Sequence, residues 1–263
     1  MDYRMISADD HLDLQYLPTD LWTARLPASL RDRAPRVEHR DSGSVWTCGD
    51  DVWGRYAGVR RASGPKPVPN AFDRQGVDES EMRPANAKLR LADMDRDGVE
   101  AQVMYGPIAA MIIDDPELRS ACIRAYNDWL KEFCSAAPNR LIGVAILPPE
   151  DPAAACDEVY LDYRFRRLWE ARAYWDQRGG IDLTTKPSEL FRRQVWASFQ
   201  EDHVAMSMLP FYGEGHVLWA SDYPHPDSTW PSSRQIIDRQ MAHLSPEIRR
   251  QVTRDNAAAL YGL

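Results

Sequence analysis

The chain has 263 residues, 44% of them hydrophobic, so it can bury a core of its own, and we favour one large α/β domain over two small ones. Its formal charge of −8 comes from acids and bases scattered along the whole length, which argues against nucleic acid and anionic membranes as partners. The longest apolar runs fall short of the roughly 18 residues of a membrane helix, and we find no signal peptide; we therefore expect a cytoplasmic protein.

The cysteine pattern favours reduced thiols. The four cysteines are far apart in the sequence and form no CxxC pair, and no histidine follows them at zinc-finger spacing. We therefore predict mostly buried, unpaired thiols in a reducing compartment rather than a structural zinc site. They are Cys48, Cys122, Cys134 and Cys156.

The amino-terminal third begins with a strand and continues into irregular sequence. In YRMISADDHLDL, Met5 and Ile6 predict a short strand that ends at a polar cluster. The sequence after residue 36 alternates about Ser42-Gly43, which is typical of a hairpin. Residues 54–84 are rich in Gly, Pro, Arg and Asp with little periodicity, so we expect the hairpin and a long excursion to occupy about 36–84.

Two helices flank the second predicted strand. The segment around Leu89 and Met94 predicts a short helix that stops at Gly98, followed by a strand at 101–105. A longer helix is expected to begin near Asp114 or Asp115, with Pro116 in its first turn. Apolar residues at steps of three and four mark its core side: Leu118, Cys122, Ala125, Trp129 and Phe133.

The remaining pattern is that of a parallel sheet. The unbroken apolar run 141–147 predicts a strand covered on both faces, with a helix after it. Further strands are expected at 194–199 and at HVLWAS, 216–221, and two or three helices close the chain. This alternation of strands and helices is typical of an α/β fold.

Asp9 and His11 are the first candidate site residues. They are two positions apart on a strand, so their side chains leave the same face, and Asp10 between them points the other way. An acid and an imidazole on one face can hold a divalent ion such as zinc or manganese. An exposed strand-end cluster without a ligand is the simpler alternative.

Asp222 stands where the strand HVLWAS must end, because Pro224 has no N–H for a further ladder bond. In parallel α/β folds the working residues lie at the carboxyl ends of strands. One oxygen of Asp222 can bind a metal ion while the other accepts a proton. His225, after the turn, is a candidate for substrate contact or for support of the site. A solvated turn is the alternative for both.

Several segments together resemble the amidohydrolase-related family of metal-dependent hydrolases and decarboxylases, which includes aminocarboxymuconate-semialdehyde decarboxylase. The resemblance covers most of the chain and implies a TIM-like (β/α)8 barrel with one metal ion, held by Asp9, His11 and Asp222. A further ligand histidine and a catalytic histidine of the family have no obvious match here. The segments are SADDHLDL, LRLADMDRDGVEAQVMYGP, PNRLIGVAILPPEDPAAA, KPSELFRRQVWASFQED, VLWASDYPHPDSTWP and RDNAAALYGL.

The middle of the expected barrel is absent from the sequence. Where eight strands are needed we find about five, near positions 5, 101, 141, 194 and 217. We favour segments missing near 159–160 and 172–174, which would leave consecutive Cα atoms there much farther apart than about 3.8 Å. An internal deletion and a diverged remnant with a smaller sheet are the alternatives.

These observations lead to three functional hypotheses. The first is a hydrolase for a small carboxylated or cyclic substrate, using one zinc or manganese ion, with Asp222 taking the proton of the attacking water and His225 assisting. The second is a non-oxidative decarboxylase with the same metal site. The third is an inactive remnant that serves as a binding or oligomerising partner, because an incomplete barrel would expose sheet edges and favour a homo-oligomer.

Overall fold

The computed structural model describes residues 3–41, 43–56, 72, 75–77, 81–107, 113–146, 193–203, 206–207, 209 and 213–263. The central sheet is parallel, with strand order β1 (Met5–His11), β5 (Val99–Tyr105) and β6 (Leu141–Gly143). A second parallel pair consists of β7 (Ala197–Phe199) and β8 (Val217–Trp219). The predicted α/β class is confirmed.

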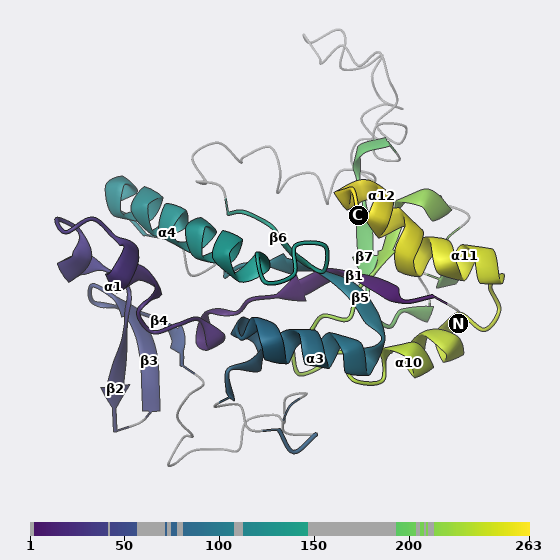
Figure 1. Ribbon diagram of the computed structural model, residues 1–263, viewed down its shortest axis with the longest axis horizontal. Coiled ribbons are helices and arrows are strands. Elements are labelled where there is room, and N and C mark those ends of the chain that lie inside the picture. Colours follow the sequence, from purple (N-terminus) through teal and green to yellow (C-terminus); the bar gives the residue numbers. More distant parts are fainter. Residues whose placement is uncertain are drawn as a thin grey trace, which may run out of the picture.

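The hairpin is part of a small antiparallel sheet. It contains β2 (Arg36–Arg40), β3 (Gly43–Cys48) and β4 (Asp51–Arg55), so a third strand extends the predicted hairpin. In Figure 1 this sheet lies at the end of the molecule opposite the carboxyl-terminal helices. Trp22, in α1 (Leu21–Arg25), connects it to the core: its ring centroid lies 5.0 Å from that of Trp46, and its Nε1 donates to the Cys122 carbonyl at 3.1 Å.

The two predicted helices after the excursion are confirmed. The first is α3 (Ala87–Asp97), whose first turn is capped by Asn86, with the left-handed Gly98 (φ 74°) at its end. The second is α4 (Pro116–Cys134), where the Asp115 carboxylate accepts from two backbone N–H groups of the first turn. The predicted apolar stripe of α4 is buried throughout. Burial of each such large side chain stabilises the fold by about 1.5–3 kcal/mol.

Four helical segments close the chain: α10 (Ser233–Gln240), α11 (Pro246–Arg250), the π-helical turn η7 (Gln251–Asp255) and α12 (Asn256–Tyr261). Of these, η7 and α12 pack against β1 and β8. Single-turn 3-10 helices connect other elements: η1 (Leu14–Tyr16), η2 (Arg31–Arg33), η4 (Arg83–Ala85) and η6 (Glu214–His216). In the described part of the chain, no helix combines the length and apolar composition needed to cross a bilayer.

Three predicted strands are shorter than expected. The prediction of a strand through 144–146, covered on both faces, was wrong: β6 ends at Gly143, and Ala145 is exposed. An apolar run supplies side chains for burial but does not supply a strand to pair with. Among the described residues past Gly143, the Val144 N–H alone continues the ladder, to the Met104 carbonyl. The strands predicted at 194–199 and 216–221 are also shorter in the structure, where they are β7 (Ala197–Phe199) and β8 (Val217–Trp219).

Gly143 also explains how closely β6 approaches α4. A Cβ at this position would lie 2.6 Å from Cγ of Leu130, a distance that real Cβ atoms do not adopt. Any larger residue would therefore require the Leu130 side chain or the backbone to move, and glycine permits this close contact between the sheet and the helix.

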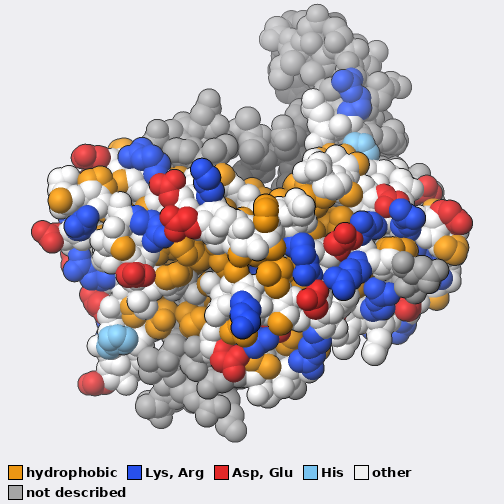
Figure 2. Space-filling view, in the orientation of Figure 1, with side chains coloured by type: hydrophobic (Ala, Val, Ile, Leu, Met, Phe, Trp, Pro, Cys, Tyr) orange, Lys and Arg blue, Asp and Glu red, His pale blue; other side chains and the backbone are white. Residues whose placement is uncertain are grey.

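The eight-stranded barrel is not closed by the described residues, which contribute the two parallel groups given above. Residues 147–192, with both predicted seams and Cys156, lie outside the described part, so the missing-segment hypothesis stays a prediction. The other three cysteines are unpaired, as predicted. Figure 2 shows acidic and basic side chains interspersed over the visible face, as their scatter in the sequence suggests.

Candidate metal centre

The end of β1 and the turn after β8 form one structural unit. The Ser221 N–H donates to the Ser7 hydroxyl at 2.7 Å, and the His11 N–H donates to the Tyr223 carbonyl at 2.8 Å. These bonds join β1 to the residues that follow the short strand β8. The turn that carries Asp222 is therefore fixed against the strand that carries Asp9 and His11.

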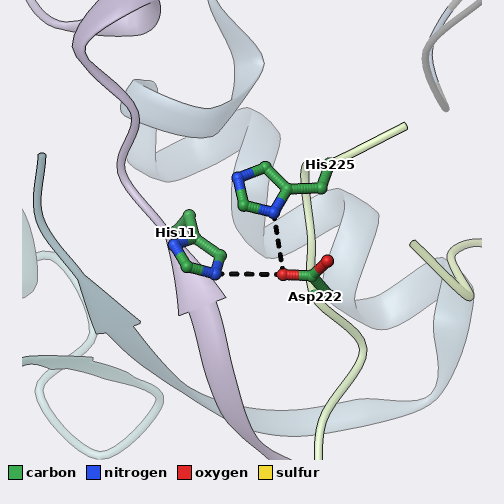
Figure 3. A group of neighbouring side chains, drawn as sticks. All are labelled: His11, Asp222 and His225. Atoms are coloured by element: carbon green, nitrogen blue, oxygen red, sulfur yellow. Dashed lines mark ion pairs between the residues drawn. The ribbon is translucent and has the colours of Figure 1, made fainter. Parts of the chain in front are cut away.

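His11, Asp222 and His225 meet at this point (Figure 3). Oδ1 of Asp222 lies 3.0 Å from Nε2 of His11 and 2.9 Å from Nδ1 of His225. The two imidazole rings stack with centroids 4.1 Å apart. One ligand atom from each residue lies within 4.8 Å of the other two. The structure thus brings together side chains from the two ends of the sequence.

Asp9 lies beside this group. Its Oδ1 is 3.6 Å from Nε2 of His11, so the two side chains share a face of β1, and its Oδ2 accepts from the Ser198 hydroxyl at 2.9 Å. Asp10 points to the other face and is fully buried. This alternation is what the strand period predicts.

The surroundings of Asp222 favour its ionised form. Burial alone would raise its pKa, but hydrogen bonds from His11 and His225 outweigh burial and lower the pKa of Asp222 to about 2. Its backbone is in the left-handed region, with φ 58°. That conformation is uncommon outside glycine, and Asp is among the residues that tolerate it.

Asp13 is the site residue that sequence reasoning missed. Its carboxylate lies 3.4 Å from Nε2 of His225, on the side of the ring away from Asp222. Hydrogen bonds to Asp13 and Asp222 raise the pKa of His225 to about 10, against the opposing effect of burial. The alternation Asp9, His11, Asp13 was the available signal, but the strand ends at His11 and the period does not apply beyond it.

The donor set suits a divalent ion. Imidazole nitrogens and a carboxylate oxygen are ligands that zinc and manganese accept. Oδ1 of Asp222 lies within 3.0 Å of a nitrogen of each imidazole, and Oδ1 of Asp9 lies 3.6 Å from Nε2 of His11, so these donors can approach one shared ion. The residues present therefore fit the single metal ion that the sequence predicts.

His216 lies away from this centre. Its ring stacks on Trp196 with centroids 4.4 Å apart, and its Nδ1 lies 3.2 Å from the Val195 carbonyl oxygen. These contacts are at the beginning of β8, whereas Asp222 follows its end.

The sequence comparisons identify related enzymes. A family model described as amidohydrolase matches residues 160–263. A γ-resorcylate decarboxylase from Rhizobium sp. is 27% identical over 166 residues, which cover 60% of this chain and 44% of that protein. The match thus spans less than half of the curated relative. The family resemblance seen in the sequence is confirmed.

Solved structures share the fold. An amidohydrolase from Mycobacterium avium subsp. paratuberculosis matches with a TM-score of 0.72 at 18% identity, with all of both chains covered. A 5-carboxyvanillate decarboxylase from Novosphingobium aromaticivorans with bound manganese has a TM-score of 0.59 at 15% identity, over 100% of this chain and 98% of the other. A 2,6-dihydroxybenzoate decarboxylase from Rhizobium has a TM-score of 0.56 at 12% identity, over 99% of both.

Proposed function

We propose that this chain, as a relative of the amidohydrolases, is a metal-dependent, non-oxidative decarboxylase of a small hydroxylated aromatic acid. The observation that carries the proposal is the convergence of His11, Asp222 and His225 on one point. The choice of decarboxylation over hydrolysis is supported by the related proteins, which act on γ-resorcylate, 2,6-dihydroxybenzoate and 5-carboxyvanillate by their names. The fold that we propose is a TIM-like barrel.

Asp9, His11 and Asp222 are the proposed ligands. Beside the His11–Asp222 pair, Asp9 and His225 compete for the third position. We assign it to Asp9, because both ring nitrogens of His225 already face carboxylates, Nδ1 toward Asp222 and Nε2 toward Asp13. A bound ion would supply positive charge that neutralises and orients the substrate carboxylate and a neighbouring oxygen.

His225 is the proposed proton carrier. An imidazole with both nitrogens against carboxylate oxygens has the contacts of an imidazolium, which has two N–H donors. In the reaction, the bond between the ring carbon and the carboxylate carbon breaks and its electron pair stays on the ring. The ring carbon takes a proton from His225 and carbon dioxide leaves. Asp13 then holds the imidazole in place for reprotonation from solvent.

The test is release of labelled carbon dioxide. Purified protein is loaded with manganese or zinc and incubated with 2,6-dihydroxybenzoate and 5-carboxyvanillate carrying a ¹³C-labelled carboxyl group. A parallel assay uses small esters, amides and lactones. We expect metal-dependent release of ¹³CO₂, abolished by a chelator and by Asp222→Asn. Hydrolysis without decarboxylation would overturn the proposal in favour of a hydrolase. Absence of both activities and of metal binding would favour the inactive remnant.

A further inference from the structure

Asp10, the residue between Asp9 and His11, contacts both neighbours of Asp222. Its Oδ1 accepts a hydrogen bond from the Ser221 hydroxyl at 2.6 Å and another from the Tyr223 N–H at 3.0 Å. Asp10 is fully buried and its two partners are 1% exposed. A single carboxylate oxygen therefore connects the residues on either side of Asp222 to strand β1.

The same turn is held at further points. The Tyr223 hydroxyl donates to Oδ2 of Asp93 at 2.6 Å, and its ring packs edge-on against Trp230 with centroids 5.6 Å apart. Together with the two bonds from β1 to Ser221 and Tyr223 described above, these contacts leave the peptide groups flanking Asp222 little freedom. Asp222 itself has the uncommon left-handed backbone, φ 58°, which Asp tolerates and which these contacts on both sides help to hold.

Arg90 connects α3 to the same network. Its guanidinium is fully buried, donates from Nη1 to the His11 carbonyl at 2.9 Å and from Nε to Oε1 of Gln102 at 2.7 Å. It lies 5.0 Å from the centre of the Tyr223 ring. Arg90 thus fixes the backbone of His11, while Asp10 fixes the backbone around Asp222.

We propose that Asp10 is a positioning residue whose buried carboxylate clamps residues 221 and 223 and thereby holds Asp222 against His11 and His225. Because side chains alternate along β1, Asp9 and His11 face the site, whereas Asp10 points to the other face and binds Ser221 and Tyr223. The structural part of this proposal stands alone, and its metal-binding consequence rests on the proposed function.

Three variants separate a clamp from a general contribution to folding. Asp10→Ala removes both accepted bonds. Asp10→Asn keeps an oxygen for both, because Oδ2 has no hydrogen-bond partner among the described residues and an amide nitrogen can replace it. The matched control is Asp97→Ala: Asp97 is 5% exposed and likewise accepts from a serine hydroxyl and a backbone N–H, both of Ser233, away from the site.

The readouts are crystal structures of the metal-free variants and manganese affinity by titration calorimetry. In Asp10→Ala we expect Asp222 to leave the left-handed region, its contact with His11 to lengthen beyond 3.0 Å, and manganese affinity to fall about 10- to 100-fold. Asp10→Asn and Asp97→Ala should keep the geometry of Asp222 and bind manganese within about threefold of the parent protein.

Each other outcome has a defined meaning. An unchanged Asp222 and unchanged affinity in folded Asp10→Ala would overturn the clamp, and equal damage from Asp10→Asn would show that charge opposite Arg90 matters instead. If Asp10→Ala does not fold, Ser221→Ala, which removes one of the two bonds, decides by the same criteria. If Asp222 moves in Asp10→Ala but the parent protein itself binds no manganese, the clamp is supported and the proposed function is overturned.

Discussion

At the scale of single residues, the site combines an uncommon backbone conformation with a concentrated charge. Asp222 has φ 58° and lies between two imidazoles, and Asp13 approaches His225 from its far side. The backbone and the charge can be separated by substitution, because asparagine tolerates the left-handed region and has no charge.

We predict that Asp222→Asn and Asp222→Ala differ in stability but not in metal binding. Both should lose manganese affinity by at least about 100-fold, since a charged ligand is removed. Asp222→Ala should also lose about 1 kcal/mol more of unfolding free energy than Asp222→Asn, because alanine has no polar side chain to favour the left-handed backbone. Urea unfolding measures the difference. Equal stability of the two variants would mean that the turn relaxes without strain.

The assignment of Asp9 and His225 gives a second prediction. Asp9→Asn should reduce manganese affinity, whereas His225→Gln should bind manganese within about tenfold of the parent protein and lose about 10²- to 10⁴-fold in kcat for decarboxylation. Calorimetry and ¹³CO₂ release measure the two quantities. Loss of manganese from His225→Gln with retention by Asp9→Asn would make His225 the third ligand instead.

At the scale of elements, a buried acid joins two helices. Asp97 ends α3, and its carboxylate accepts the N–H and the hydroxyl of Ser233, the first residue of α10, at 3.0 and 2.5 Å. Burial raises the pKa of Asp97 to about 6, although the bonds from Ser233 oppose the shift. Ionisation of Asp97 is therefore more difficult in the folded protein than in the unfolded chain.

This shift predicts an unusual contribution to stability. Between about pH 4 and pH 6 the folded state holds the Asp97 proton and the unfolded state releases it, so the unfolding free energy falls as pH rises through this range. Across this range, the ionisation of Asp97 lowers the unfolding free energy by on the order of 2–3 kcal/mol. Urea unfolding at several pH values should show a smaller fall for Asp97→Asn than for the parent protein. Parallel pH profiles would exclude this role for Asp97.

At the scale of the whole molecule, the candidate metal centre joins the two ends of the chain. His11 ends the first strand, and Asp222 precedes the closing helices. An ion bound between them would stabilise only the folded state, because these residues are far apart in the unfolded chain. Homo-oligomerisation, expected from exposed sheet edges, stays a prediction that light scattering can test.

We predict that manganese at about 100 times its Kd stabilises the protein by about 2.7 kcal/mol and raises Tm by roughly 5–10 °C. Addition of a chelator should reverse the shift, and Asp222→Asn should show none. Differential scanning calorimetry measures Tm in each case. A parent protein with the same Tm in manganese and in chelator would contradict a metal centre that joins the two ends.

The sequence by itself determined the features that follow from local rules. The apolar period, the stop at Gly98 and the cap near Asp114 or Asp115 predicted α3 and α4, and the strand period predicted that Asp9 and His11 share a face. Pro224 marked the end of the extended segment before Asp222. These predictions succeeded because each depends on residues a few positions apart.

Only the tertiary structure decided which distant groups meet. The contact of Asp13 with His225, the bonds from Asp10 to Ser221 and Tyr223, and the early end of β6 at Gly143 all depend on partners from other elements. A side chain more than 200 positions away leaves no periodic trace in the sequence. Such contacts are fixed by how helices and strands pack, and that packing is a property of the folded chain as a whole.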